Sequence, residues 1–394
     1  MKKIMILGAG IYQVPLIKKA RDMGLFTIVV SVDGPYPGFA LADKIYKYDT
    51  RDGESILAAA ICENIDGIVT TGTDVAVRSL GFVCDAMNLS GISAKAARLV
   101  TDKADMKIAF RRGVSTSPFR LLRENEKEKA ASYARDIGYP VMVKACDVSG
   151  SRGISRVESP DRLDEAVALS FAATHTDHIL IEKAVEGYEI GVDGFVRNGK
   201  TVLCLPHNKQ ITRCKDTTVP TGHSFPFKGS EPLKAAIRRE FEAVVQATGL
   251  DNCAVNMDVF VTGEETVSVL EAGGRCGATT IPELISIYTG VDYYEGMIRC
   301  ALGEDFDFAP KAEEPCMGQL LMSPRDGTIT AIYGEGLEKI RQEGIDFSLD
   351  YGVGDKVYQM KNGTDRIGQI IMKTAHEREI QAVTDRILSC LTIE

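Results

Sequence analysis

The stretch Gly138–Val157, GYPVMVKACDVSGSRGISRV, decides how the rest of this chain is interpreted. An apolar run of strand type ends at Lys144, and a loop of small residues with Gly150, Arg152 and Gly153 follows directly. Backbone N–H groups of such a loop can hold phosphate oxygens, because glycine lets the chain approach them closely. A lysine adds a positive charge at the same place. Taken alone, the pattern also fits an ordinary strand and hairpin turn, so the phosphate interpretation depends on the other motifs.

Acidic residues on predicted strands follow the loop. HILIEKAVEGYEIGVDGF contains Glu182 and Glu189, VNMDVF contains Asp258, and VSVLEAGGRCGA contains Glu271 and Arg275. In this order, the lysine, the glycine loop and the two acidic pairs resemble the ATP-grasp superfamily over most of the chain. Within it, the EAGGRCGA and GHSFP stretches resemble the amino-acid and dipeptide ligases, and the chain is also similar to carbamoyl-phosphate-synthase-like members.

The resemblance implies a nucleotide site made of two lysines, the loop and a hinge. Lys103 and Lys144 would contact the phosphates, and a mobile loop would close over ATP and exclude water. The run from Glu182 to Val185 would offer backbone groups to adenine, and Glu189 would accept both ribose hydroxyls. A solvated lysine at a helix start and an exposed strand end are the alternatives. The residues implied to bind ATP are Lys103, Lys144, Ser149, Gly150, Ser151, Gly153, Glu182, Lys183, Val185 and Glu189.

The strand pair that carries Asp258 and Glu271 has Gly263 in its turn. Carboxylate oxygens are the ligands that magnesium prefers, and the resemblance makes these two residues ligands of Mg²⁺ or Mn²⁺. Arg275 resembles the catalytic arginine that steadies a transferring phosphoryl group or an acyl phosphate. The family pattern places asparagine where this chain has Gly273, and Asp258 replaces a longer side chain. The number of metal ions therefore stays open, and two exposed acids across a hairpin are the alternative.

The expected fold class is α/β and α+β. Strand and helix patterns alternate in residues 1–100, which predicts a parallel sheet in a pre-ATP-grasp domain. Residues 101–310 form the expected ATP-grasp domain, with a lid subdomain at about 117–185. Residues 311–394 form a small α+β domain that closes the core, with the strand-like pieces CMGQLLMSP and GQIIMKTA and a last helix.

Two further regions supply candidates for substrate binding. The glycines Gly8 and Gly10, with Asp33, imitate a dinucleotide fingerprint, but Gln13 stands in the place of its third glycine. In the superfamily this domain helps to hold the second substrate. The basic run from His207 to His223, which includes Lys215, suits an anionic substrate, although a mobile solvated loop fits it nearly as well. The substrate candidates are Gly10, Thr73, Asp74, Lys209, Arg213, His223 and Gly273.

Composition excludes several classes of protein. The 394 residues are 44% hydrophobic and 26% charged, as in a soluble globular chain, and no apolar run approaches the ~20 residues of a membrane helix. The net charge of −9 without a long basic stretch argues against nucleic acid as a partner. The ten cysteines show no CxxC spacing and no Cys/His cluster. MKKIMILGAG is interpreted as a first strand rather than a signal peptide, so a cytoplasmic location is expected.

The resemblance implies an ADP-forming carbon–nitrogen ligase that uses ATP and Mg²⁺ (or Mn²⁺). It would activate a carboxylate as an acyl phosphate and join it to an amine, and both partners would be small molecules that the sequence does not identify. An ATP- and bicarbonate-dependent carboxylase and a nucleotide-binding protein without turnover, suggested by Gly273, are alternatives. An NAD-dependent oxidoreductase is a further rival, against which the broken fingerprint argues. The assembly state stays open, and a homodimer is among the options.

Overall fold

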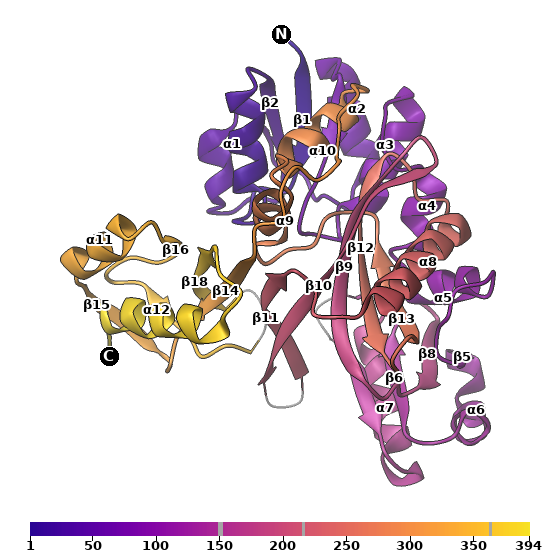
Figure 1. Ribbon diagram of the computed structural model, residues 1–394. Helices are drawn as coiled ribbons and strands as arrows, with labels where there is room; N and C mark the ends of the chain where they lie inside the picture. The colour runs from indigo at the N-terminus through magenta and orange to yellow at the C-terminus, as the bar shows by residue number, and fades with distance from the viewer. Residues whose placement is uncertain (149–152, 215–216, 362–364) are drawn as a thin grey trace. The chain divides into compact units, whose positions relative to one another are not determined.

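The computed structural model describes residues 1–148, 153–214, 217–361 and 365–394 (Figure 1). The chain forms two compact units, which are described separately. The first unit comprises Met1–Pro206, Gly229–Gly277 and Tyr294–Phe308. The second comprises His207–Lys228, Ala278–Tyr293 and Ala309–Glu394.

The first unit begins with the predicted parallel sheet, in the order β3-β2-β1-β4. Its two central strands, β2 and β1, are buried because both are mostly apolar, which is typical of parallel sheets. The elements are β1 (Lys3–Leu7), α1 (Val14–Asp22), β2 (Phe26–Val30), η1 (Pro37–Leu41), β3 (Lys44–Tyr46), α2 (Gly53–Glu63), β4 (Gly67–Val69), α3 (Val77–Met87) and α4 (Ala94–Leu99). The alternation expected from the sequence is confirmed.

An antiparallel sheet in the order β5-β8-β6-β7 follows. Helices α6 and α7 pack against it and share one apolar core with it, which includes Leu122, Ala134, Val143 and Leu163. The elements are α5 (Lys103–Phe110), β5 (Phe119–Arg123), η2 (Glu124–Lys129), α6 (Ala130–Ile137), β6 (Val141–Ala145), β7 (Ile154–Val157), η3 (Pro160–Arg162), α7 (Leu163–Ala173) and β8 (His178–Lys183).

A second antiparallel sheet in the first unit has the order β13-β12-β9-β10. The predicted hairpin is present, because β12 and β13 pair antiparallel and are joined by a turn that contains Gly263. The elements are β9 (Tyr188–Arg197), β10 (Lys200–Cys214), α8 (Glu231–Thr248), β12 (Cys253–Val261), β13 (Val267–Gly273) and α10 (Tyr293–Ala301). Strand β10 continues from the first unit into the second.

The second unit extends from β10 in the order β10-β11-β14-β18-β16, and β17-β15-β19 form a separate sheet. Its core includes Met317, Leu321, Ile370 and Ile387. The two predicted strands and the last helix of the tail are present as β14, β18 and α12. The elements are β11 (Thr217–Phe225), α9 (Ile281–Thr289), β14 (Cys316–Met322), β15 (Gly327–Ile332), α11 (Gly334–Gln342), β16 (Asp346–Leu349), β17 (Lys356–Val357), β18 (Arg366–Met372), α12 (Glu377–Ser389) and β19 (Leu391–Ile393).

The tail contains more structure than the sequence predicted. Helix α11, GEGLEKIRQ, is not among the elements predicted from the sequence, and glycine, a poor helix former, occurs twice in it. It forms because Leu337 and Ile340 are buried in the core of the second unit. Across the described part of the chain, every helix is too short or too polar to cross a bilayer.

Candidate active site

One face of the β9–β12–β13 sheet carries most of the predicted acidic residues. Antiparallel partners project to the same side of a sheet, and alternate residues along a strand share that side. The rows on this face are Asp193–Asn256–Gly273, Gly191–Asp258–Glu271 and Glu189–Phe260. The predicted metal acids Asp258 and Glu271 are therefore direct cross-strand partners. Glu189, the predicted ribose acid, lies on the same face one row away.

Lys103 links this face to the loop that follows β6. It is the first residue of α5, a helix start fixed by Asp102, whose side chain accepts hydrogen bonds from two backbone N–H groups. Lys103 Nζ lies 3.2 Å from Glu271 Oε2 and donates to Val148 O at 3.2 Å. Burial opposes the lysine charge, but the nearby acidic groups, Glu271 first among them, together raise the pKa of Lys103. The lysine therefore stays charged where phosphate oxygens would need it.

Lys144 is held by a buried carboxylate. Glu182 is 1% exposed; one carboxylate oxygen contacts Lys144 Nζ, and the other lies 2.9 Å from Lys107 Nζ. Burial opposes the charge of Glu182, but the two lysines lower its pKa. Burial also lowers the pKa of Lys107. The sequence predicted that the backbone of Glu182 contacts adenine. The structure shows that its side chain balances the charges of Lys144 and Lys107 inside the protein.

Lys107 was not predicted from the sequence as a residue of this site. The signal was present, because residues 103, 106, 107 and 110 form one helical stripe, and Met106 and Phe110 on it are buried. A lysine on a buried stripe needs a counter-charge, which Glu182 supplies.

The other residues predicted to bind ATP differ from one another in their contacts and burial. Lys183 Nζ donates to the carbonyls of Gly138 and Tyr139 at 3.0 and 2.9 Å, so its side chain holds the residues just before β6 in place. Val185 is half-buried in the link between β8 and β9. Gly153 has φ +63°, and a Cβ there would lie 2.5 Å from Ala173 Cβ, so only glycine fits. Ser149, Gly150 and Ser151 lie outside the described residues.

Arg275 follows β13 and is enclosed by polar groups. Its Nη2 donates to Asp74 Oδ2 at 2.8 Å, and its Nη1 donates to Asn256 Oδ1 at 3.1 Å. Asn256 in turn donates to Asp193, a fully buried carboxylate that also accepts from the Gly277 N–H at 2.8 Å. Burial opposes the arginine charge, but the carboxylates around it, Asp74 first among them, together raise the pKa of Arg275. Sequence reasoning did not single out Asp193 or Asn256, because each shows its role only through cross-strand pairing.

The N-terminal glycine loop is closed by Gln13. Its Oε1 accepts from the Gly10 N–H at 3.0 Å, and its Nε2 donates to Thr71 O at 2.6 Å. A Cβ at Gly8 would lie 2.9 Å from the Gln13 side chain, so that side chain fills the space inside the turn. A dinucleotide phosphate would have to displace it. Asp33, the acid of the imitated fingerprint, is exposed and pairs with Lys47 at 2.8 Å.

Thr73 and Asp74 lie in the loop after β4, at the carboxyl end of the parallel sheet, where ligands of such sheets gather. The structure brings Asp74 to Arg275. The other substrate candidates, Lys209, Arg213 and His223, belong to the second unit. There Lys209 and His223 are cross-strand partners, and the rings of His207 and His223 meet edge to face at 4.9 Å. Burial is the main cause that holds the pKa of His223 well below 6.5, so this ring is neutral. The Arg213 side chain lies outside the described part.

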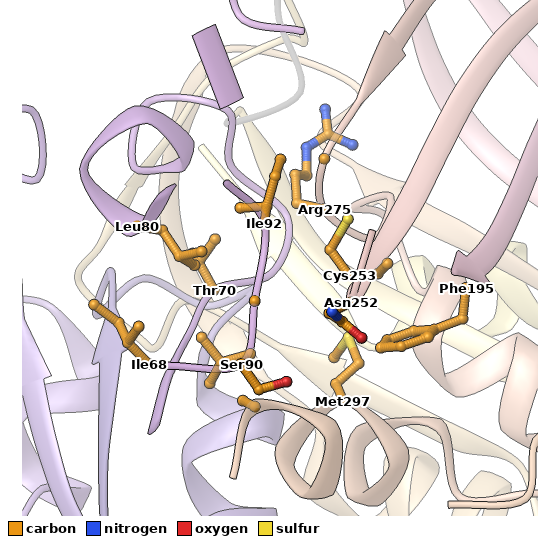
Figure 2. A pocket seen from close by; sticks show the side chains of 15 residues that line it. Ile68, Thr70, Leu80, Ser90, Ile92, Phe195, Asn252, Cys253, Arg275 and Met297 are labelled. Atoms are coloured by element: carbon orange, nitrogen blue, oxygen red, sulfur yellow. The ribbon is translucent and has the colours of Figure 1, made fainter. Parts of the chain in front are cut away.

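A small apolar cavity lies behind Arg275 (Figure 2). Its volume is about 40 Å³, and its lining includes Ile68, Phe195 and Met297. Figure 2 shows the Arg275 guanidinium directed away from Phe195 and Met297. A space of this size holds only a few water molecules, because one water needs about 10–15 Å³ of such volume. The cavity is therefore too small for a nucleotide.

Comparison with known proteins agrees with this geometry. The family model described as D-ala D-ala ligase C-terminus matches residues 109–298, and that described as L-amino acid ligase C-terminal domain 2 matches residues 319–394. A formate-dependent phosphoribosylglycinamide formyltransferase of Herminiimonas arsenicoxydans is 31% identical over 194 residues, 48% of this chain and 47% of the relative. A D-alanine–D-alanine ligase of Kineococcus radiotolerans is 29% identical over 227 residues, 52% of this chain and 59% of the relative. The chain thus spans about half the length of these curated relatives.

Solved structures match over the whole chain. A phosphoribosylglycinamide synthetase from Anaerococcus prevotii has a TM-score of 0.80 at 26% identity, covering 100% of this chain and 99% of that one. An L-amino acid ligase from Bacillus licheniformis has a TM-score of 0.81 at 18% identity, covering 100% and 98%, and this likeness concerns the fold alone. With the family models and the order of motifs, these matches show that the chain belongs to the ATP-grasp superfamily of carboxylate–amine ligases.

Proposed function

We propose that this protein activates a small-molecule carboxylate as an acyl phosphate and joins it to an amine, with release of ADP and phosphate. The observation that carries the proposal is the shared face of β9, β12 and β13. On it Glu189 lies one row from the opposed Asp258 and Glu271, and Lys103 Nζ is 3.2 Å from Glu271. The groups that we assign to ribose, metal and phosphate thus follow one another along one surface.

The carboxylates of Asp258 and Glu271 fit a magnesium site that ATP completes. Within the described ranges, no group of three or more His, Cys, Asp or Glu could hold a metal ion on its own. Magnesium commonly takes one or two carboxylates, with phosphate oxygens and water as its other ligands, and two opposed carboxylates meet that demand. When bound there, Mg²⁺ would neutralise charge on the ATP phosphates.

The chain's own residues bind and orient the reactants. A substrate carboxylate oxygen attacks the γ-phosphorus while the bond from phosphorus to the ADP oxygen breaks, and ADP departs. The amine nitrogen then attacks the acyl carbon, loses its proton, and phosphate leaves. Lys103 and Lys144 neutralise phosphate charge, and Arg275 meets the charge of the acyl phosphate. Positioning and charge neutralisation supply the catalysis in such phosphoryl transfers.

The test is release of ADP and phosphate across a panel of acids and amines, with each omitted in turn and with bicarbonate as a separate arm. We expect ATP turnover that requires an organic acid, and an amide product only when acid and amine are both present. Glu271→Gln should abolish ligation, because it removes one opposed carboxylate. Glu264→Gln is the matched control, since Glu264 is exposed in the turn of the same hairpin.

Two results would replace the proposal. ATP hydrolysis that depends on bicarbonate rather than an organic acid would indicate a carboxylase. Tight nucleotide binding without turnover, with every acid and with either Mg²⁺ or Mn²⁺, would indicate a nucleotide-binding protein.

A further inference from the structure

The space next to Gly273 is occupied by the side chain of Asp74, from the loop after β4. A Cβ on Gly273 would lie 3.2 Å from Asp74 Oδ1 and 3.5 Å from Arg275 Cζ. The asparagine that the family pattern places here would extend beyond that Cβ, toward the Asp74 carboxylate. Asp74 and an asparagine at residue 273 therefore compete for one space. The glycine leaves no opening for a substrate at this point, because Asp74 fills it.

The Asp74 carboxylate faces one edge of the Arg275 guanidinium. Its Oδ2 accepts from Nη2 at 2.8 Å, and its Oδ1 lies 2.7 Å from Nε. The side chain of Asp74 is 35% exposed, and that of Arg275 is 15% exposed. Nη1 donates to Asn256 Oδ1 on β12. The carboxylate and the amide together fix the plane of the guanidinium, because each engages a different side of it.

The loop that carries Asp74 is fastened at several points. The Gly72 N–H donates to Cys276 O at 3.2 Å, next to Arg275 itself. Thr71 O accepts from Gln13 Nε2, and Asp74 O accepts from the Val77 N–H at 3.1 Å. Hydrogen bonds therefore hold the loop that carries Asp74 in place beside Arg275.

We propose that Asp74 replaces the side chain that residue 273 lacks, and that it is the positioning residue for Arg275 in the ligation. The inference rests on the proposed function, in which Arg275 meets the developing charge of the acyl phosphate. It explains how the chain accommodates the departure from the family pattern, since Asp74 from the loop after β4 takes the space that an asparagine at 273 would fill and directs its carboxylate to Arg275. Asp74 acts through Arg275 and is not a metal ligand.

The test is an exchange of side chains between the two positions. Asp74→Ala should lower kcat about 10- to 100-fold, the size expected for a lost hydrogen bond between charged groups, with KM for ATP within about twofold. Gly273→Asn should lower kcat similarly, because its side chain displaces Asp74. The double variant Asp74→Ala/Gly273→Asn should regain at least about tenfold over either single variant, because the amide then occupies the vacated space. Asp33→Asn is the control, an exposed ion-paired carboxylate after the neighbouring strand β2.

Two measurements separate this inference from the proposed function. The ¹⁵N-edited NMR signal of the Arg275 Nη2 protons, which donate to Asp74, should be protected from exchange in the wild type, lost in Asp74→Ala and regained in the double variant; Arg275→Lys assigns the signal. Mn²⁺ affinity in the presence of a non-hydrolysable ATP analogue should be equal in wild type and Asp74→Ala. Unchanged kcat in Asp74→Ala, strictly additive losses in the double variant, or Mn²⁺ affinity that falls together with kcat would overturn the inference. A wild type without ATP turnover would refute the proposed function, while the NMR comparison would still decide whether Asp74 orients Arg275.

Discussion

Glu182→Gln is expected to be among the most destabilising single changes near the proposed nucleotide site. The Glu182 carboxylate is almost fully buried, contacts Lys144 and Lys107, and accepts from Ser117 Oγ at 3.0 Å. The amide removes the negative charge and leaves two lysines without their shared counter-charge. Breaking a buried ion pair by removing one partner costs about 3–5 kcal/mol. Lys107→Met should cost less, about 1–3 kcal/mol, because Glu182 keeps Lys144 and Ser117 as partners.

Urea unfolding at pH 7 measures both losses. Glu126→Gln is the control, since Glu126 forms an exposed pair with Lys129 and such pairs contribute about 1 kcal/mol or less. The pH dependence supplies a second check. Because the folded-state pKa of Glu182 is lowered, its stabilisation is complete above its ordinary pKa of 4.5 and declines as the pH falls through the folded value. The difference in unfolding free energy between wild type and Glu182→Gln should therefore be constant above about pH 5.5 and shrink below 4.5.

A loss of stability in Lys107→Met as large as that in Glu182→Gln would contradict this prediction. Unfolding of both variants at the urea concentration of the Glu126→Gln control would contradict it as well. Either result would mean that the carboxylate is not the shared counter-charge of the two lysines.

Four further changes test other parts of the molecule. Lys144→Ala should weaken ATP binding about 10- to 100-fold in calorimetry, the size of a lost charged contact, and unchanged affinity would contradict its phosphate role. Glu189→Gln should weaken ATP binding without changing Mn²⁺ affinity, and a nucleotide complex with the ribose far from Glu189 would refute this. Arg275→Ala should lower kcat far more than nucleotide affinity, whereas equal losses would mean a structural arginine. Since the folded-state pKa of His223 is depressed, the unfolding free energy should fall by about 1.4 kcal/mol per pH unit below pH 6.5, and His223→Gln should remove that slope.

Local patterns predicted much of the fold. The run into Lys144 is a strand, the first hundred residues form a parallel sheet, and the hairpin at Gly263 sets Asp258 opposite Glu271. Each of these features depends on residues close in sequence, so periodicity and turn residues suffice to predict it.

The network around the site depends on residues far apart in sequence. Arg275 and Asp74 are separated by 201 positions, and Asn256 and Asp193 by 63. No local pattern reports a pairing of this kind, because it is set by strand register and by how sheets pack. Lys107 is an intermediate case, since its helical stripe gave a local signal that a charged residue was buried.

The pairing of β11 with β14 has a consequence for shortened forms of this protein. Four residue pairs join the two strands, from Gly222–Gln319 to Phe225–Cys316. A nonsense mutation or a protease cut just before β14 would remove β14 as the partner of β11. The backbone N–H and C=O groups of β11 on that side would then have no strand to pair with. Such an edge is a template for pairing with other chains. The expected product of early termination is therefore a self-associating fragment rather than a smaller enzyme.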